Sequence, residues 1–157
     1  MLEYTVEAYR SSPHTATARS GRASDASVSL DIDPSGRPDA FNPAELLLTA
    51  LAACLLKGIE RVTPMLTFEL RSAAVRVHGI RQDSPPRMLS VEYELAVDTD
   101  ESDSRLDLLH RNLQKYGTVF NTLSRALDLT GTIHRGELTA LRRAVDAPRG
   151  TGPSQDL

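Results

Sequence analysis

The chain has 157 residues, enough for one domain to bury a hydrophobic core without disulfide or metal staples. Its 40% hydrophobic and 25% charged residues are typical of a globular protein, and its net charge of −3 gives no basic footprint for nucleic acid or an anionic membrane. One cysteine excludes an intrachain disulfide, and no apolar run suits a signal peptide or a membrane span, so we expect a protein of the reducing cytoplasm.

The first part of the chain predicts strands. Residues 2–10 alternate acceptably for a strand, and residues 27–32 (SVSLDI) place three apolar side chains on one face. Residues 15–25 are polar and contain glycine, which is consistent with either a turn region or a short exposed strand. Residues 33–39 (DPSGRPD) predict a loop by their proline and glycine content.

The clearest predicted element is a helix that begins after Asn42. Asn42 fits the N-cap, Pro43 the first turn and Glu45 the third position of a capping box. We expect the helix to run to about Val62 and to stop before Pro64, because proline disfavours helix at the preceding residue. Its middle, LLLTALAACLL, is apolar on every face, so it must be covered all round. A small chain with few other helices needs a partner subunit to do this.

The rest of the chain predicts two strands joined as a hairpin, then two helices and a last strand. They are expected at residues 66–82, 87–98, 101–116, 118–127 and 129–134. The order of elements indicates an α+β fold. The last stretch, residues 147–157, is rich in Pro, Gly and polar residues and is expected to be disordered.

The order of elements, with FNPAELLLTALAACLL at its centre, resembles the OsmC/Ohr family of peroxide-reducing proteins. The most specific match is Asn42-Pro43 followed by a leucine-rich helix that contains Ala-Ala-Cys54. Residues 19–22 (RSGR) are similar to a segment that supplies the family's active-site arginine, which is Arg19 here. Residues 115–123 (KYGTVFNTL) correspond to the segment with the family's second cysteine, and Asn121 matches an asparagine found there.

The resemblance spans residues 1–136 and leaves residues 137–157 as a C-terminal extension. It implies an antiparallel sheet with a central buried helix and an intertwined homodimer, whose active sites lie at the subunit interface. This agrees with the partner subunit that the apolar helix requires.

Two positions depart from the peroxidase pattern of the family. The second cysteine is missing, and Gly117 stands at or next to its position, which indicates a divergent subgroup. The usual glutamate after Asn-Pro is replaced by Ala44, and Glu45 follows one residue later, about 100° further around the helix. Residue 44 lies about 15 Å along a straight helix from Cys54, so a carboxylate at the helix start reaches only the thiol of a partner subunit.

The resemblance implies that Cys54 is the nucleophile of a peroxide reductase acting on organic hydroperoxides in oxidative-stress defence, regenerated by an external thiol. The thiolate is the attacking form; Arg19 would stabilise it, and Glu45 would serve as an acid or orient Arg19 across a dimer. Other interpretations stay open, since cysteine is commonly buried for packing and Glu45 also completes a capping box. The alternative function is a non-catalytic dimer that binds a small hydrophobic ligand.

We expect no cofactor and no metal site, and neither nucleic acid nor membrane as a partner. The histidines lack metal-ligand spacing, and no phosphate-binding loop or nucleophile elbow occurs. Lys57 is expected to face solvent, and Tyr93 and Phe120 to pack in the core or an interface.

Overall fold

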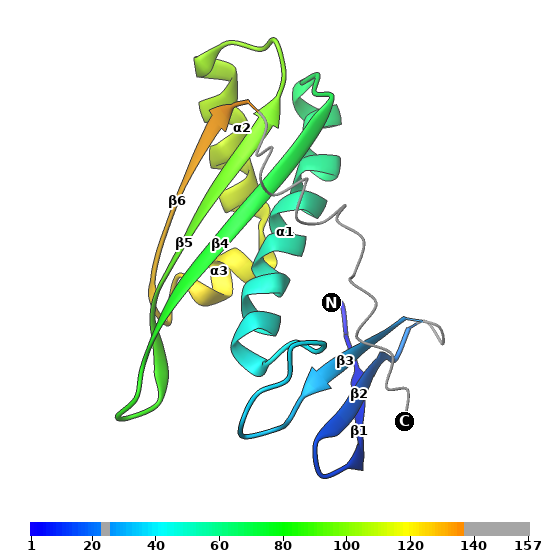
Figure 1. Ribbon diagram of the computed structural model, residues 1–157. Coiled ribbons are helices and arrows are strands. Elements are labelled where there is room, and N and C mark those ends of the chain that lie inside the picture. The colour runs from blue at the N-terminus through cyan, green and yellow to red at the C-terminus, as the bar shows by residue number, and fades with distance from the viewer. Residues whose placement is uncertain (23–25, 137–157) are drawn as a thin grey trace, which may run out of the picture. The chain divides into compact units, whose positions relative to one another are not determined.

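The computed structural model describes residues 1–22 and 26–136 (Figure 1). They form six strands and three helices: β1 (Val6–Ser12), β2 (Thr15–Ser20), β3 (Ser27–Asp31), α1 (Pro43–Leu66), β4 (Ser72–Gln82), β5 (Arg87–Asp98), α2 (Asp103–Tyr116), α3 (Thr118–Leu123) and β6 (Asp128–Arg135). The predicted α+β class is confirmed. The chain divides into two compact units, residues 1–50 and residues from Leu51 onward, each described by itself below. The proposed C-terminal extension, residues 137–157, lies outside the described residues.

The first unit contains an antiparallel sheet in the order β1-β2-β3. Residues 15–20, which the sequence left open between turn and strand, form its central strand, and Ala16 and Ala18 are buried there. Asp31 ends β3 and organises the predicted loop, because its carboxylate accepts hydrogen bonds from the backbone N–H groups of Asp33 and Arg37 at 2.9 and 3.0 Å.

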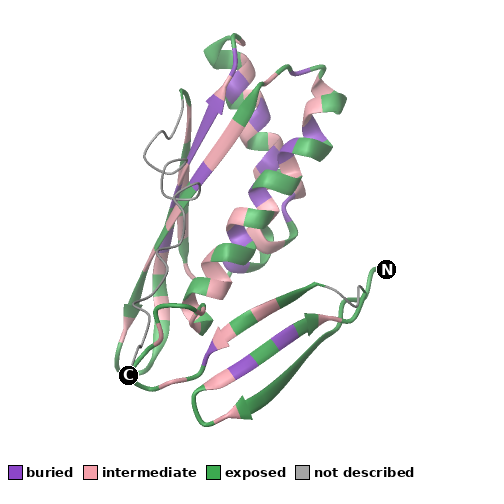
Figure 2. Ribbon diagram, turned by 45° about the vertical axis from the view of Figure 1, so that its right-hand side comes forward, coloured by how far each residue is buried: buried purple, intermediate pink, exposed green. Residues whose placement is uncertain are grey.

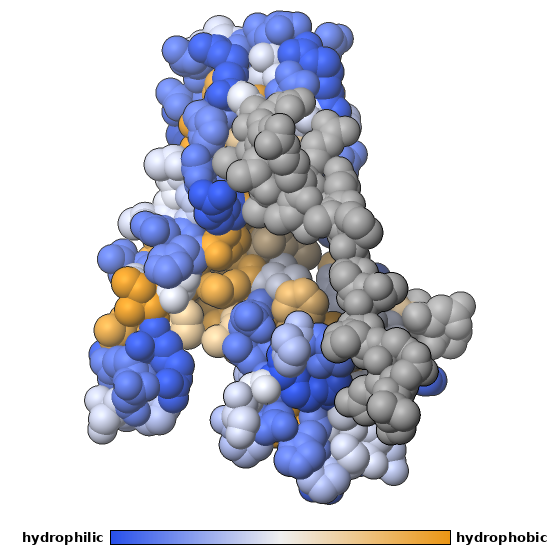
Figure 3. Space-filling model, viewed as in Figure 1, coloured by the Kyte–Doolittle hydropathy of each residue, from blue (hydrophilic) through white to orange (hydrophobic). Residues whose placement is uncertain are grey.

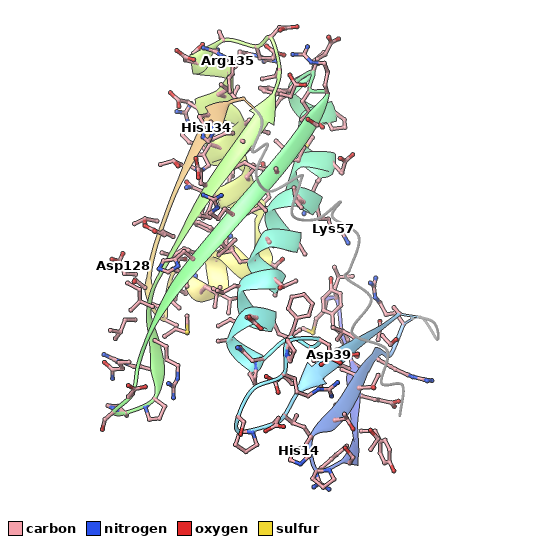
Figure 4. The ribbon with its side chains drawn as sticks, in the orientation of Figure 1. His14, Asp39, Lys57, Asp128, His134 and Arg135 are labelled. Atoms are coloured by element: carbon pink, nitrogen blue, oxygen red, sulfur yellow. The ribbon has the colours of Figure 1, made fainter. Side chains whose placement is uncertain are left out.

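The second unit contains a sheet in the order β4-β5-β6. β4 and β5 form the predicted antiparallel hairpin. β6, whose ends Asp128 and Arg135 are labelled in Figure 4, pairs with β5 in parallel. This corrects the expected all-antiparallel arrangement in one pair of strands. The physical reason is that α2 and α3 lie between β5 and β6 in the chain and carry it back, so that β6 starts at the same end as β5.

The helices of the second unit cover one face of this sheet (Figure 1), and the core lies between them (Figure 2). β5 alternates buried residues toward the helices with charged residues such as Glu92 and Glu94 on the other face. The buried side chains recur at helical spacing along α1 and α2. They are Leu51, Leu55, Ile59 and Val62 of α1, and Leu106, Leu109 and Leu113 of α2.

The end of α1 differs from its prediction, since the helix continues past Pro64 to Leu66. It ends in a Schellman motif: the Phe68 N–H donates to Thr63 O at 2.9 Å, and the Thr67 N–H donates to Pro64 O at 3.3 Å. Thr67 adopts a φ of 48°, and the carbonyls of Leu66 and Thr67 each accept a hydrogen bond from the Arg105 guanidinium at 2.8 Å. These contacts close the helix two residues beyond its proline.

Candidate functional site

Cys54 lies in the middle of α1 and is half-buried, between the fully buried Leu51 and Leu55. Gly58 follows four residues later on the same face of the helix. A Cβ placed at Gly58 would lie 3.0 Å from Leu113 Cδ2, and a Cβ placed at Gly117 would lie 3.5 Å from Cys54 Sγ. The C-terminal end of α2 therefore packs closely on α1 where the side chains of α1 are small.

Gly117 is buried between α2 and α3 and forms one wall beside the sulfur of Cys54. Its φ of −77° suits any residue, so backbone conformation does not require glycine here. Space does: an added Cβ would lie 2.8 Å from Leu113 O and 3.0 Å from Phe120 Cβ. Thus the position that the resemblance assigns to the second cysteine does lie against Cys54, but no side chain fits there without a shift of the turn.

The turn between α2 and α3 is held by Asn121. Its side-chain amide donates to three backbone carbonyls, those of Gln114 and Lys115 at 3.1 Å and that of Gly117 at 2.9 Å. Carbonyls at a helix end lack partners within the helix, so such contacts fix the course of the chain after it. Asn121 thereby ties the last turn of α2 to the wall beside Cys54.

A polar cluster formed by Tyr93, His110 and Gln114 joins β5 to α2. The Tyr93 hydroxyl lies 2.7 Å from His110 Nε2 and accepts a hydrogen bond from Gln114 Nε2 at 3.1 Å. Burial raises the pKa of Tyr93, and burial lowers the pKa of His110. A Cβ at Gly131, opposite Tyr93 on β6, would lie only 2.1 Å from the Tyr93 ring, so this glycine makes room for the tyrosine.

The sequence did not reveal this cluster. His110 and Gln114 share a helix face at the i, i+4 spacing, which is a detectable signal. Their partner on a distant strand is not detectable from local pattern.

Arg19 and Glu45 belong to the first unit. Arg19 is exposed on β2, in register with Glu7 of β1 and Ser27 of β3. Glu45 closes the predicted capping box: its Oε2 accepts the Asn42 N–H, and its own N–H donates to Asn42 Oδ1, both at 2.9 Å. One carboxylate oxygen of Glu45 is thus engaged in starting α1.

Other predicted positions are as follows. Lys57 is exposed and points away from the sheet of the second unit (Figure 4). Tyr93 is buried and makes an edge contact with Phe120, at a ring-centroid distance of 6.3 Å. Within residues 1–22 and 26–136, no group of three potential ligands could hold a metal ion. In the same part of the chain, no helix combines the length and apolar content needed to cross a membrane.

The sequence and the fold are both similar to known proteins. The sequence model of the OsmC-like protein family matches residues 35–131. The structure is similar to an OsmC-like protein from Mycoplasma pneumoniae, with a TM-score of 0.76 and 19% identity over 87% of this chain and 99% of that one. None of the curated proteins matches the sequence.

Two further similar structures carry names that refer to hydroperoxides. The organic hydroperoxide resistance protein OsmC from Legionella pneumophila has a TM-score of 0.68 and 14% identity, over 85% of this chain and 97% of that one. The organic hydroperoxide resistance protein OhrB of Bacillus subtilis has a TM-score of 0.61 and 16% identity, over 85% and 98%. At these identities the similarity shows a shared fold.

Proposed function

The chain belongs to the OsmC-like protein family, and on this basis we propose that it is a thiol-dependent peroxide reductase that uses Cys54 as its only redox-active thiol. The observation that carries the proposal is the contact between Gly117 and Cys54 Sγ. It brings the segment that the resemblance assigns to the second cysteine against the first. The names of the Legionella and Bacillus proteins support organic hydroperoxides as the substrate class and stress defence as the role.

The proposed reaction begins with attack of the Cys54 thiolate on one peroxide oxygen. A sulfur–oxygen bond forms, the oxygen–oxygen bond breaks, and the leaving alkoxide takes a proton to become an alcohol. Cys54 is oxidised to a sulfenic acid. With one cysteine in the chain, an external thiol condenses with the sulfenic acid to release water, and a second thiol then frees Cys54 and leaves as a disulfide.

We further propose that a homodimer completes the site. α1 exposes Ala53 and Leu56 next to Cys54, and apolar side chains gather over α1 in the space-filling view (Figure 3). A second copy of the chain would cover them. In such a dimer Arg19 would hold the thiolate of Cys54 by its charge, and Glu45 would orient Arg19.

The test is consumption of cumene hydroperoxide with dithiothreitol as reductant. We expect turnover by the wild type, labelling of Cys54 by dimedone as a sulfenic acid, and loss of both in Cys54→Ser. Arg19→Gln should slow the peroxide step about tenfold or more, since removal of a charge-assisted contact costs roughly 1.5–3 kcal/mol. Lys57→Gln, on the exposed side of the same helix, serves as the control and should leave the rate unchanged.

Glu45→Gln separates the two interpretations of Glu45. Glutamine also serves at this position of a capping box, so stability should stay the same. A slower peroxide step at unchanged stability supports a role in the site, and an unchanged rate removes Glu45 from it. If the Cys54 thiol stays unmodified in excess peroxide, the peroxidase is wrong and the alternative, a dimer that binds a small hydrophobic ligand, takes its place.

A further inference from the structure

We propose that Tyr93, His110 and Gln114 form a proton-sensitive latch that holds the end of α2, and with it the wall beside Cys54, in place. The regulatory meaning of the latch rests on the proposed function of Cys54. The latch itself follows from the hydrogen bonds, the packing and the position of the three side chains.

The hydrogen bonds require a neutral histidine. Gln114 Nε2 donates to the Tyr93 oxygen, so the tyrosine hydrogen is free to donate to His110 Nε2 at 2.7 Å. Gln114 Nε2 also lies 3.3 Å from His110 Nε2. That nitrogen therefore acts as an acceptor, and the ring proton is on Nδ1. A proton added to Nε2 would leave three donor groups around one acceptor, the Tyr93 oxygen.

The packing makes such a mismatch costly. Tyr93 is buried, with 3% of its surface exposed, and its ring lies against Gly131 of β6 and Phe120 of α3. His110 is half-buried and makes an edge contact with Tyr93, with ring centroids 5.7 Å apart. A partly buried donor without an acceptor destabilises its site.

The charges around His110 favour the same direction. Desolvation lowers the pKa of His110, and the nearby Asp107 of α2 opposes this as the smaller effect. Tyr93 is the titratable group that faces it from β5, and it is neutral at these pH values. A histidine with a lowered pKa supports folding above its ordinary pKa of 6.5, and this support is lost as the pH falls through the lowered value.

The latch connects to Cys54 through two short links. Gln114 contributes its side chain to the latch, while its carbonyl accepts a hydrogen bond from the Asn121 amide. The same amide donates to Gly117 O, and Gly117 is the wall against Cys54 Sγ. Release of Gln114 from Tyr93 therefore loosens the wall, and acid should open this side of the sulfur to bulkier molecules.

The experiment compares alkylation of Cys54 by a small reagent, iodoacetamide, and a bulkier one, N-ethylmaleimide, between pH 7.5 and 5.5. The ratio of their rate constants is independent of how much thiolate is present, because both reagents need it. For the wild type we expect the maleimide to iodoacetamide ratio to rise roughly three- to tenfold on acidification, as local opening becomes easier.

Two variants test the latch itself. In His110→Gln, which keeps an acceptor near the position of Nε2 but does not titrate, the ratio should stay constant with pH. In Gln114→Glu, the new carboxylate accepts from both Tyr93 and a protonated His110, so the wall should stay closed in acid. The control is His78→Gln on β4, outside the latch, which should retain the wild-type rise.

A wild-type ratio that does not change with pH, or an equal rise in His110→Gln, would overturn the proposal. Because both reagents modify any accessible thiol, the result is independent of the peroxide assay. A wall that opens in acid beside a thiol inert to peroxide would refute the function and support the latch, and an active enzyme with a constant ratio would do the reverse.

Discussion

At the scale of single residues, two glycines of the second unit each face a side chain from another element. Gly117 faces Cys54, and Gly131 faces Tyr93. In both cases the backbone conformation accepts other residues, and the space does not. Each glycine therefore marks a contact between elements, in contrast to Gly36, whose φ of 81° favours glycine by conformation.

Gly117→Cys should create a pair of thiols that hydrogen peroxide or an organic hydroperoxide converts into a disulfide. The added Cβ would lie 3.5 Å from Cys54 Sγ, which is close enough for bonding after a small shift. In the reduced state the variant should lose about 1–3 kcal/mol of unfolding free energy, because the new side chain crowds Leu113 O. Non-reducing mass spectrometry detects the disulfide, and urea unfolding measures the loss. Two free thiols after oxidation would contradict the contact.

Gly131→Ala should destabilise the chain by about 2–3 kcal/mol, since the new methyl overlaps a buried and hydrogen-bonded ring. The urea midpoint measures this. In the background Tyr93→Leu, which removes the ring, the same substitution should cost less than about 1 kcal/mol, because neighbouring substitutions are not additive. Equal costs in both backgrounds would show that Tyr93 does not occupy the space beside Gly131.

At the scale of elements, the end of α1 carries a β-branched residue in the left-handed region. Thr67→Gly should raise the unfolding free energy by about 1 kcal/mol, because glycine adopts a φ of 48° without the strain of a Cβ. The matched control is Thr49→Gly within α1, which should lower stability because glycine disfavours a helix interior. Thermal or urea unfolding of the two variants should show opposite signs.

The elements were predictable to the extent that their signals are local. The capping box at Asn42 and the alternation of Val91, Tyr93 and Leu95 gave α1 and β5 correctly, because both depend on neighbours in the sequence. Pro64 misled the prediction, since the Schellman contacts and the Arg105 guanidinium, from a distant helix, stabilise two more residues of helix. The predicted short helix over 118–127 ends at Leu123, before a turn.

The candidate site divides in the same way. Cys54 and Gly117 were found through the resemblance, and the structure brings them together. The contacts of Tyr93 with His110 were not predictable, because they join a strand to a helix more than a dozen residues away. Arg19 and Glu45 as partners of the thiol remain predictions.

At the scale of the whole molecule, the exposed strip of α1 carries the proposal of a dimer. We expect sedimentation equilibrium to give twice the chain mass of 17.1 kDa. Leu56→Glu should shift the protein to the monomer, because it places a charge in an apolar interface, at a cost of several kcal/mol. Arg111→Glu, exposed on α2, should leave the mass unchanged. A wild-type monomer would remove the shared site and the roles proposed for Arg19 and Glu45.

The parallel pairing of β6 with β5 also has a consequence for synthesis. β5 ends at Asp98 and β6 begins at Asp128, so about 30 residues must be added before the free edge of β5 meets its partner. At ordinary translation speeds this takes roughly 2–6 s. During that interval a nascent chain presents an unpaired strand rich in valine and leucine, which is the kind of segment that ribosome-associated chaperones shield. The hairpin forms early; the ribosome must finish the last strand before the sheet can close.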